Sequence, residues 1–301
     1  MVAIVAEDFE THRPHLLAVG YRLTGSVTDA EDAVQEAWLR LSNSAAEEIR
    51  DLRAWLTTVV GRICLDRLRS AAVRRESYVG QWLPEPFVTP LTGPPTPDPL
   101  DSVVQQEDSR FAAMVVLDSL SPPQRVAFVL HDAFDVPFDE IAQILDISVQ
   151  SARQLASRAR RTVASTPPPV DAAEHEQAIA ALMTAMANGD INAVVAALDP
   201  DAVMIGDAGG TTRTAVNVVH GADKIARFLL GLIRKYGEDR LQEYVPVRVN
   251  GQLGFYTPGS PGDADHPPMA PRVMALSVRD GKVVGAFDIA NPAKLHGLKL
   301  A

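Results

Sequence analysis

Hydrophobic positions recur at three-and-four spacing through most of the first 165 residues, a pattern that predicts helices. From Leu52 to Leu68 the apolar side chains form one stripe, and the Arg side chains lie mostly off it. We expect an earlier helix to begin at a capping box of Thr28 and Glu31, and a later one to begin at Ser121–Gln124. The first half of the chain is therefore predicted to be all-α.

The pattern changes in the last segment of the chain. Two helices are expected first, one ended by Gly189 and one that Asp190 caps and that runs to Leu198. Alternating runs then flank Asn250-Gly251 and Asp280-Gly281, and such dipeptides between such runs are strong signals of β-hairpins. Helices followed by antiparallel hairpins predict an α+β domain.

Two proline-rich stretches separate these patterns. Residues 82–99 hold seven prolines and residues 166–170 hold three, which favours extended, semi-rigid connectors over helix. The chain is therefore predicted to be multidomain, with a helical bundle, a Pro-rich linker, a second helical domain and an α+β domain at residues 1–78, 79–102, 103–165 and 173–301.

The distribution of charge matters more than its sum. The net charge is −10, which would ordinarily argue against a nucleic-acid partner. However, residues 50–75 carry seven Arg against two Asp, and residues 148–163 carry four Arg and no acid. Because binding depends on local patches, both segments are candidates for contact with DNA.

Two other classes are disfavoured by composition. The single Cys64 excludes an intramolecular disulfide and makes a zinc site improbable, so we predict no metal and no cofactor. The N-terminus has no signal-peptide pattern, and no apolar run is long enough to span a membrane. We therefore expect a cytoplasmic protein without a membrane partner.

Residues 137–163 have the pattern of a helix-turn-helix. A first helix to Leu145 is followed by the turn Asp146–Ser148 and by a second, Arg-rich helix, Val149–Val163. Side chains of this second helix suit contacts with base edges or sugars at Gln150, Ser151, Arg153 and Gln154, and contacts with phosphates at Arg158, Arg160 and Arg161. The alternative is a small helical bundle with a solvated Arg face.

The helix of residues 50–75 is the second DNA-binding candidate. Trp55 beside Arg53, Arg62 and Arg69 would suit melted DNA, because bases stack on aromatic rings while Arg follows the backbone. Trp55 also lies on the apolar stripe, so these residues alone favour a core role. Two separated helical units joined by an extended linker would read two spaced DNA elements.

In combination, these motifs resemble the extracytoplasmic-function sigma factors of RNA polymerase. Residues 21–26 and 29–40 look like the domain-two helices that bind the β′ clamp helices, which implies polymerase-binding roles for Asp29, Glu31, Asp32, Gln35, Glu36 and Trp38. Residues 54–69 look like the segment that captures the minus-ten element. Residues 148–161, beginning at Ser148, look like the minus-thirty-five recognition helix. The implied partners are core RNA polymerase, through its β′ and β subunits, and promoter DNA.

The linker, the last domain and the tail are similar to the subgroup with a SnoaL-like, NTF2-like cone domain. The resemblance implies that the C-terminal domain regulates the protein through contacts with the sigma core and the linker. The implied regulatory residues of the linker, the C-terminal domain and its tail are Trp82, Leu83, Pro84, Glu85, Pro86, Asp207, Asn291, Pro292, Lys294 and Leu295. We also expect Trp82 to be buried against the C-terminal domain, because it is a large aromatic residue in an otherwise extended linker.

Three positions depart from the family pattern. Gly61-Arg62 stands where the family often has Arg-Asn, so a flipped-base contact is not carried over there. Residues 207–210 only approximate the subgroup's Asp-Gly-Gly-Gly-Lys loop, and Ala293 replaces its usual Asp.

The last domain also contains polar residues that would suit an enzyme or a ligand site. Polar residues that could serve an enzyme are Asp207, Arg213, His220, Tyr256 and Asp288, but no compact motif joins them, so we predict no catalytic residues and no enzyme. A small ligand in the cone stays open, and we expect a monomer when the protein is free. The competing readings are a ligand-sensing helix-turn-helix regulator and an NTF2-like enzyme with a DNA-binding appendage.

Overall fold

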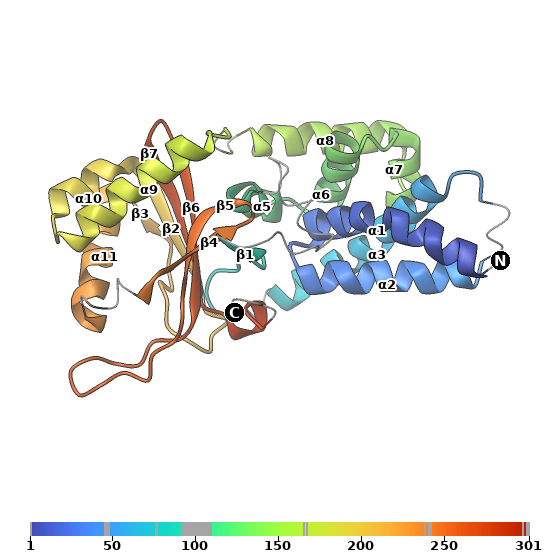
Figure 1. The fold of residues 1–301 in the computed structure, drawn as a ribbon. Helices are drawn as coiled ribbons and strands as arrows, with labels where there is room; N and C mark the ends of the chain where they lie inside the picture. The colour runs from blue at the N-terminus through green and yellow to red at the C-terminus, as the bar shows by residue number, and fades with distance from the viewer. Residues whose placement is uncertain are drawn as a thin grey trace. The chain divides into compact units, whose positions relative to one another are not determined.

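The computed structural model describes residues 2–44, 49–75, 78–91, 110–164, 166, 168–237, 239, 243–296 and 298, with only the backbone described at 2–5 and 72–75. The end of the predicted proline-rich stretch, from residue 92, lies outside this part. The chain forms two compact units (Figure 1). The first contains the described residues up to 75 and from 113 to 166; the second contains 78–91, 110–112 and those from 168 onward.

The first unit is helical, as predicted. Its described elements are α1 (Val2–Thr24), α2 (Val27–Ser42), α3 (Leu52–Arg75), α5 (Phe111–Asp118) from Ala113 onward, α6 (Pro122–Phe128), a π-helical turn (Val129–Ala133), α7 (Phe138–Leu145) and α8 (Val149–Val163). The apolar stripe of α3 is buried, including Leu56, Val60 and Ile63, and packs against α1 and α2. No helix in the described part of the chain is long and apolar enough to cross a membrane.

The predicted start of α2 is wrong by two residues. The N-cap is Ser26, whose Oγ accepts a hydrogen bond from the Asp29 N–H at 3.1 Å, and not Thr28. Gly25 ends α1 with a φ of 70°, a left-handed conformation that glycine adopts without strain. This turn leaves Ser26 in extended backbone, which is the conformation that an N-cap requires.

The helix-turn-helix is present with the predicted bounds. α7 ends at Leu145 and its C-cap, Asp146, has a φ of 55°, while Ser148 caps α8 by accepting from the Ser151 N–H at 3.1 Å. The predicted start of α6 is also confirmed, because the Gln124 side chain accepts from the Ser121 N–H at 3.1 Å.

The two helical regions share a buried contact rather than standing apart as the sequence suggested. α3 packs against α6 and α7, and a Cβ on Gly61 would lie only 3.3 Å from a methyl of Leu130. Arg125, 1% exposed, donates to the Arg22 carbonyl at 3.2 Å and pairs with Asp118 at 2.9 Å. Gly61 permits the close approach of the helices. The buried Arg125 guanidinium joins the two helical regions, because it bonds to Arg22 of α1 and to Asp118 of α5.

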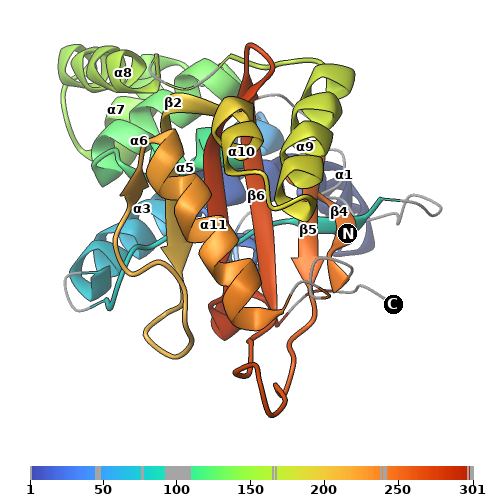
Figure 2. The ribbon, with the colours of Figure 1, turned by 90° about the vertical axis from the view of Figure 1, so that its left-hand side faces the viewer.

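The second unit is an α+β fold, as predicted. One sheet has the strand order β1-β4-β5-β6-β7-β2-β3, with β1 (Val88–Pro90), β2 (Leu198–Asp207), β3 (Val219–His220), β4 (Val245–Val249), β5 (Gln252–Thr257), β6 (Arg272–Arg279) and β7 (Lys282–Ile289). The helices α9 (Ala172–Ala187), α10 (Ile191–Ala197) and α11 (Ala222–Tyr236) lie over one face of the sheet (Figure 2).

The predicted hairpins and helix ends are confirmed in this unit. Asn250 and Asp280 have φ angles of 51° and 53° and each precedes a glycine of positive φ, as a two-residue hairpin turn requires. Asp190 caps α10 by accepting from two backbone N–H groups. Leu198, expected in that helix, instead begins β2, which pairs in parallel with β7.

Candidate functional site

Helix α8 has one small-residue face and one polar face. Ala152, Ala156 and Ala159 are fully buried, and their small side chains allow α8 to lie close to α6 and α7. The exposed face carries most of the residues predicted to contact DNA, namely Ser148, Gln150, Arg153, Gln154, Arg158, Arg160 and Arg161, while Ser151 is half-buried. The structure therefore brings the predicted recognition residues onto one accessible surface.

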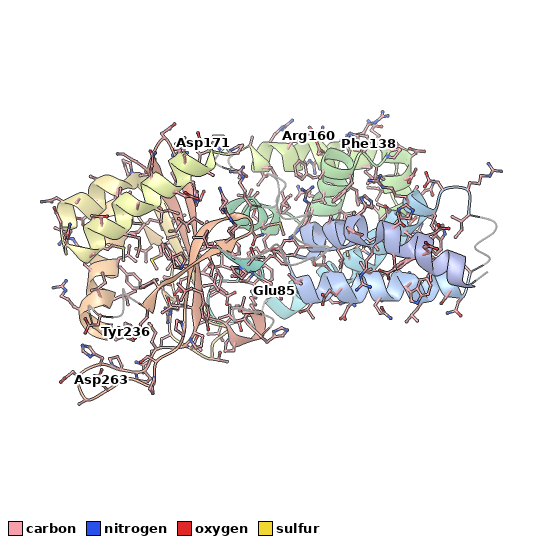
Figure 3. All side chains as sticks on the ribbon, viewed as in Figure 1. Glu85, Phe138, Arg160, Asp171, Tyr236 and Asp263 are labelled. Atoms are coloured by element: carbon pink, nitrogen blue, oxygen red, sulfur yellow. The ribbon has the colours of Figure 1, made fainter. Side chains whose placement is uncertain are left out.

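Two of these Arg residues are held by neighbouring elements. The Arg153 guanidinium lies 5.8 Å from the Phe138 ring centre, and that ring stacks on His131 with centres 3.8 Å apart. Arg160 makes two hydrogen bonds to Asp132, at 2.6 and 3.1 Å (Figure 3). The bond to Asp132 raises the Arg160 pKa. Because its guanidinium is engaged with Asp132, a phosphate contact by Arg160 stays a prediction.

The Arg residues of α3 have protein partners too. An Arg62 Nη donates to the Gln143 carbonyl of α7 at 3.4 Å, and Arg69 lies 3.7 Å from Asp66. Trp55 is half-buried, so it is neither a free stacking platform nor a full core residue. The structure leaves the predicted contact of these residues with melted DNA untested.

Arg53 is positioned by a neutral histidine. Burial, followed by the charges of Arg53 and His12, lowers the pKa of His15 to about 4, so the ring is uncharged at neutral pH. One His15 nitrogen lies 3.0 Å from the Thr57 hydroxyl, and the other lies 3.2 Å from an Arg53 Nη. A neutral ring can therefore donate to Thr57 while accepting from Arg53.

The acidic helix α2 divides into exposed and paired residues. Glu31, Asp32 and Gln35 are exposed, and Leu39 beside them is 52% exposed. The other acids of the predicted set form ion pairs, Asp29 with Arg67 at 2.8 Å and Glu36 with Arg40 at 2.5 Å.

Two α2 residues depart from the expectation of a purely polar contact surface. Arg67 reaches Asp32 as well, at 3.3 Å, but Asp32 stays largely in solvent. Trp38 is half-buried because its ring lies 5.0 Å from that of Phe9. The exposed Leu39 was missed by sequence reasoning, since the helical pattern alone does not separate a contact surface from core.

A buried carboxylate, Asp207, connects the linker to the C-terminal domain. Asp207 has no exposed surface, although it is the last residue of β2 and precedes a glycine-rich loop. It accepts from the Tyr78 hydroxyl at 2.5 Å and from the Leu83 N–H at 2.9 Å. Lys294 of the tail pairs with it at 2.6 Å. We call Tyr78, Leu83, Asp207, Asn291 and Lys294 the linker anchor.

The tail completes the linker anchor from the other side. The Lys294 Nζ also donates to the Leu83 carbonyl and lies 3.8 Å from the Trp82 ring centre, a cation–π geometry. The Asn291 side chain donates to the Tyr78 hydroxyl at 2.8 Å. Pro292 and Ala293 are exposed and Leu295 is half-buried, so the missing Asp at position 293 costs no buried contact.

The predicted docking of the linker is confirmed, with a change in the residue that is buried. Trp82 is only half-buried, whereas Leu83 is 1% exposed and Pro84, Glu85 and Pro86 are also buried. The indole of Trp82 covers the mostly buried ammonium group of Lys294 rather than entering the interior. Leu83, the smaller apolar residue, therefore fills the interior.

Downstream of the linker anchor, the linker joins the sheet. Phe87 exchanges two hydrogen bonds with Asn250, and Val88–Pro90 then pairs with the edge strand β4 as β1. This is strand addition by a connector, which satisfies an otherwise open sheet edge. Neither Tyr78 nor Asn250 was predicted to hold the linker, since Tyr78 lies outside the recognised motifs and Asn250 was recognised only as part of a hairpin turn.

The enzyme-like residues do not form one site. Asp207 belongs to the linker anchor, Arg213 and His220 are exposed, and only Asp288 lines a cavity. Burial raises the Cys64 pKa to about 12, so its thiol is not a nucleophile at neutral pH. Within the described residues, no group of three His, Cys, Asp or Glu side chains could hold a metal.

Known proteins match this chain over nearly all of its length. The family models for Sigma-70 region 2 and Sigma-70, region 4 match residues 9–74 and 110–163. ECF RNA polymerase sigma factor SigJ of Mycobacterium tuberculosis is 54% identical over 296 residues, 97% of this chain and 94% of the relative. Probable ECF RNA polymerase sigma factor SigI of the same organism is 31% identical, covering 98% of this chain and 96% of the relative.

A solved structure supports the same relationship. The crystal structure of the Mycobacterium tuberculosis extracytoplasmic function sigma factor SigJ matches with a TM-score of 0.84 and 51% identity, covering 98% of this chain and 100% of that one. The two Sigma-70 regions of the helical unit, followed by an α+β unit, define a transcription protein of several domains. This chain belongs to the extracytoplasmic-function sigma factors of RNA polymerase, which confirms the predicted resemblance.

The linker anchor generates a first prediction, for the variant Lys294→Met. The change removes the ammonium group and leaves Asp207 buried without its counter-charge, so the linker should undock more often. Each lost ~1.4 kcal/mol raises the undocked population about tenfold. Limited chymotrypsin digestion of the folded protein should cleave after Trp82 and Phe87 at least about tenfold faster.

Lys224→Met is the matched control, because Lys224 is an exposed lysine on α11. It should leave the cleavage rate of wild type unchanged. Equal cleavage of Lys294→Met and wild type would show that the ion pair does not hold the linker.

Proposed function

We propose that this chain directs core RNA polymerase to promoters through two surfaces of its helical unit, while its C-terminal unit controls the linker. The observation that carries the regulatory part is the buried Asp207, which binds linker and tail together. Family membership supports the polymerase and promoter partners. The protein itself catalyses no reaction in this proposal, acts where RNA polymerase works, in the cytoplasm, and is monomeric when free.

The polymerase contact is assigned to the exposed side of α2. Its acids Glu31 and Asp32 and the amide of Gln35 surround the exposed Leu39, so an apolar contact has a polar, negatively charged rim. Asp29, Glu36 and Trp38 support this surface through their contacts with Arg67, Arg40 and Phe9. A basic partner helix would be complementary in charge.

Promoter recognition is assigned to the exposed side of α8, with α3 as the second contact. The N-terminal turns of α8 present Gln150, Arg153 and Gln154, which suit base edges in the major groove. Arg158 and Arg161 lie further along the same face and suit phosphates. On α3, Arg53, Arg62 and Arg69 are assigned to the backbone of the melted strand.

Regulation is assigned to the competition for the linker. Residues 83–86 are buried in the second unit and residues 88–90 are part of its sheet, so this segment is not free to bind polymerase or DNA. Release of the linker costs the contacts of the linker anchor, and the C-terminal unit therefore sets how readily the linker is available. The cavity lined by Asp288 makes a small ligand a candidate modulator.

The polymerase assignment predicts the effect of a double charge reversal, Glu31→Lys with Asp32→Lys. Repulsion across the contact should weaken binding to core polymerase at least about tenfold in a pull-down, with folding unchanged because both side chains are exposed. Glu176→Lys with Asp201→Lys makes the same change of charge at exposed positions of the second unit and should bind as wild type. If both pairs bind equally, the α2 surface is not the contact, and a regulator that works without polymerase is favoured.

The promoter assignment predicts different effects for two α8 residues. Arg158→Ala should weaken binding of the polymerase complex to all DNA sequences alike and lower the slope of log K against log salt by about 1. Gln154→Ala should cost ~1–3 kcal/mol on the preferred promoter and little on other DNA. Arg227→Ala, at an exposed arginine of α11, is the control for loss of charge. Identical losses for both α8 variants on every DNA would contradict the division of roles.

The regulatory assignment predicts the effect of releasing the linker. Truncation after Ala290 removes Asn291 and Lys294, whereas Lys294→Met removes only the ammonium group. Each of the two variants should raise run-off transcription with core polymerase by about twofold or more, because each weakens the docking of the linker. The transcription start site should not change. Unchanged output from both variants would remove the regulatory role while leaving the sigma-factor function intact.

A further inference from the structure

The second unit contains a cavity whose wall is mostly apolar. It measures about 40 Å³, more than the ~10–15 Å³ that one water needs but less than the ~150 Å³ of a cavity that holds benzene, so a ring-sized ligand fits only when side chains of the wall move aside. Four methionines contribute to the wall, together with Leu229, Leu232, Ile233, Tyr236 and Tyr244. Tyr236 marks the end of α11 beside this cavity (Figure 3). Methionine side chains adapt their shape to a ligand more easily than branched ones.

One polar group of the wall has unused hydrogen-bonding capacity. Asp288 is 2% exposed, and its Oδ2 accepts from the Thr214 hydroxyl at 2.6 Å and from Arg272 at 3.0 Å. Its Oδ1 is buried and has no hydrogen-bond partner among the residues that the structure describes. A buried carboxylate oxygen without a donor costs ~1–3 kcal/mol or more. A donor supplied by a bound molecule would recover this free energy.

The surroundings hold the Asp288 carboxylate in place. Gly206 is its neighbour on β2, and a Cβ there would lie 2.2 Å from the Thr214 hydroxyl. Only glycine at this position lets Thr214 reach Asp288. Arg272 is held in turn by the Arg213 carbonyl at 3.2 Å. With Oδ2 engaged from two directions, Oδ1 is the oxygen that a bound molecule could still satisfy.

Register places the Asp288 side chain on the side of the cavity. Met274 on β6 is the cross-strand partner of Asp288 on β7, so their side chains project from the same face of the sheet. Both line the cavity, and Met204 of β2 lines it from the next strand. The Asp288 side chain and the apolar wall therefore belong to one site.

We propose that this cavity binds a small, uncharged, mostly apolar molecule whose single hydroxyl or N–H group donates a hydrogen bond to Asp288 Oδ1. The Asp288–Arg272 pair is neutral as a whole, so a charged ligand would be desolvated without a counter-charge, at a cost of several kcal/mol. A neutral donor contributes about 1 kcal/mol and also satisfies the buried oxygen. The balance therefore selects an alcohol, a phenol or a neutral N–H compound over a cation or an anion.

Tyr244 adds no charge to the site. Burial, followed by the charge of Asp288, raises the pKa of its phenol, so the side chain stays neutral at physiological pH. The ligand class deepens the regulatory role proposed above and rests on it only for an effect on transcription. Binding itself is independent of that role.

The test uses the full-length protein with labelled methionine methyl groups and two probes of nearly equal shape, phenol and toluene. Of the seven methionines, Met186, Met204, Met269 and Met274 line the cavity, whereas Met114 and Met183 do not. Phenol should shift the methyl signals of the four lining residues and leave the other two in place. It should bind at least about fivefold tighter than toluene, which lacks a donor.

Two variants separate the apolar wall from the donor recognition. Leu232→Trp fills the cavity and should abolish the shifts caused by either probe. Asp288→Leu with Arg272→Met replaces the buried pair by apolar groups, a change that folded proteins often tolerate. This double variant should keep toluene binding and lose the preference for phenol.

Three results would overturn the proposal: no shift at the lining methionines, equal affinity of wild type for phenol and toluene, or a phenol preference that persists in the double variant. Tighter binding of benzylamine, a cation at neutral pH, would replace the neutral ligand by a charged one and contradict the proposed class. None of these outcomes depends on transcription, so a failure here leaves the sigma-factor function untouched.

Discussion

The arrangement of the second unit depends on how one buried carboxylate is satisfied. A fully buried Asp207 would be strongly destabilising without partners, because its desolvation costs several kcal/mol. Its donors come from three distant parts of the chain: Tyr78 and the Leu83 N–H from the linker, the Gly209 N–H from its own loop, and Lys294 from the tail. Because loss of any of them leaves the others with a poorer partner, linker and tail should be bound or released together.

The same two strands carry the linker anchor and the cavity. On β2 and β7, Gly206 pairs with Asp288 and the following residue, Asp207, pairs with Ile289. The loop after Asp207 bonds through Thr214 to Asp288 and, at 2.8 Å, through Thr212 to the carbonyl of Ala290, the residue before Asn291 of the linker anchor. A ligand that orders Asp288 would therefore act on the residues next to the linker anchor. This proximity is a physical route for coupling, and its strength is set by how differently the two linker states bind the ligand.

Local features of the fold could be predicted from the sequence, and long-range ones could not. The helix-turn-helix and both hairpins are specified by neighbouring residues, such as Asn250-Gly251 with its positive φ angles. The parallel pairing of β2 with β7 and the addition of β1 to β4 join segments far apart in sequence, and no local pattern encodes them. The capping error at Thr28 arose because the left-handed turn at Gly25 makes Ser26 the first residue that can cap the helix, and the S/T-x-x-E pattern does not show this turn.

The candidate sites follow the same division. The exposed face of α8 follows from helical periodicity, so its recognition residues could be placed by sequence alone. The engagement of Arg160 with Asp132 and of Arg62 with Gln143 depends on tertiary packing and was not foreseen. In the linker, aromatic size suggested Trp82 as the buried residue, but Trp82 is only half-buried over Lys294 and Leu83 is buried instead.

The most direct test of the central claim is hydrogen exchange at the Leu83 backbone amide in the free, full-length protein. This N–H donates to the buried Asp207 at 2.9 Å, whereas Gly80, three residues earlier, is exposed. A linker held by the C-terminal unit predicts that Leu83 exchanges at least about 100-fold more slowly than Gly80, after correction for intrinsic rates. Exchange of both amides at their intrinsic rates would show that the linker is free in solution and would contradict the account.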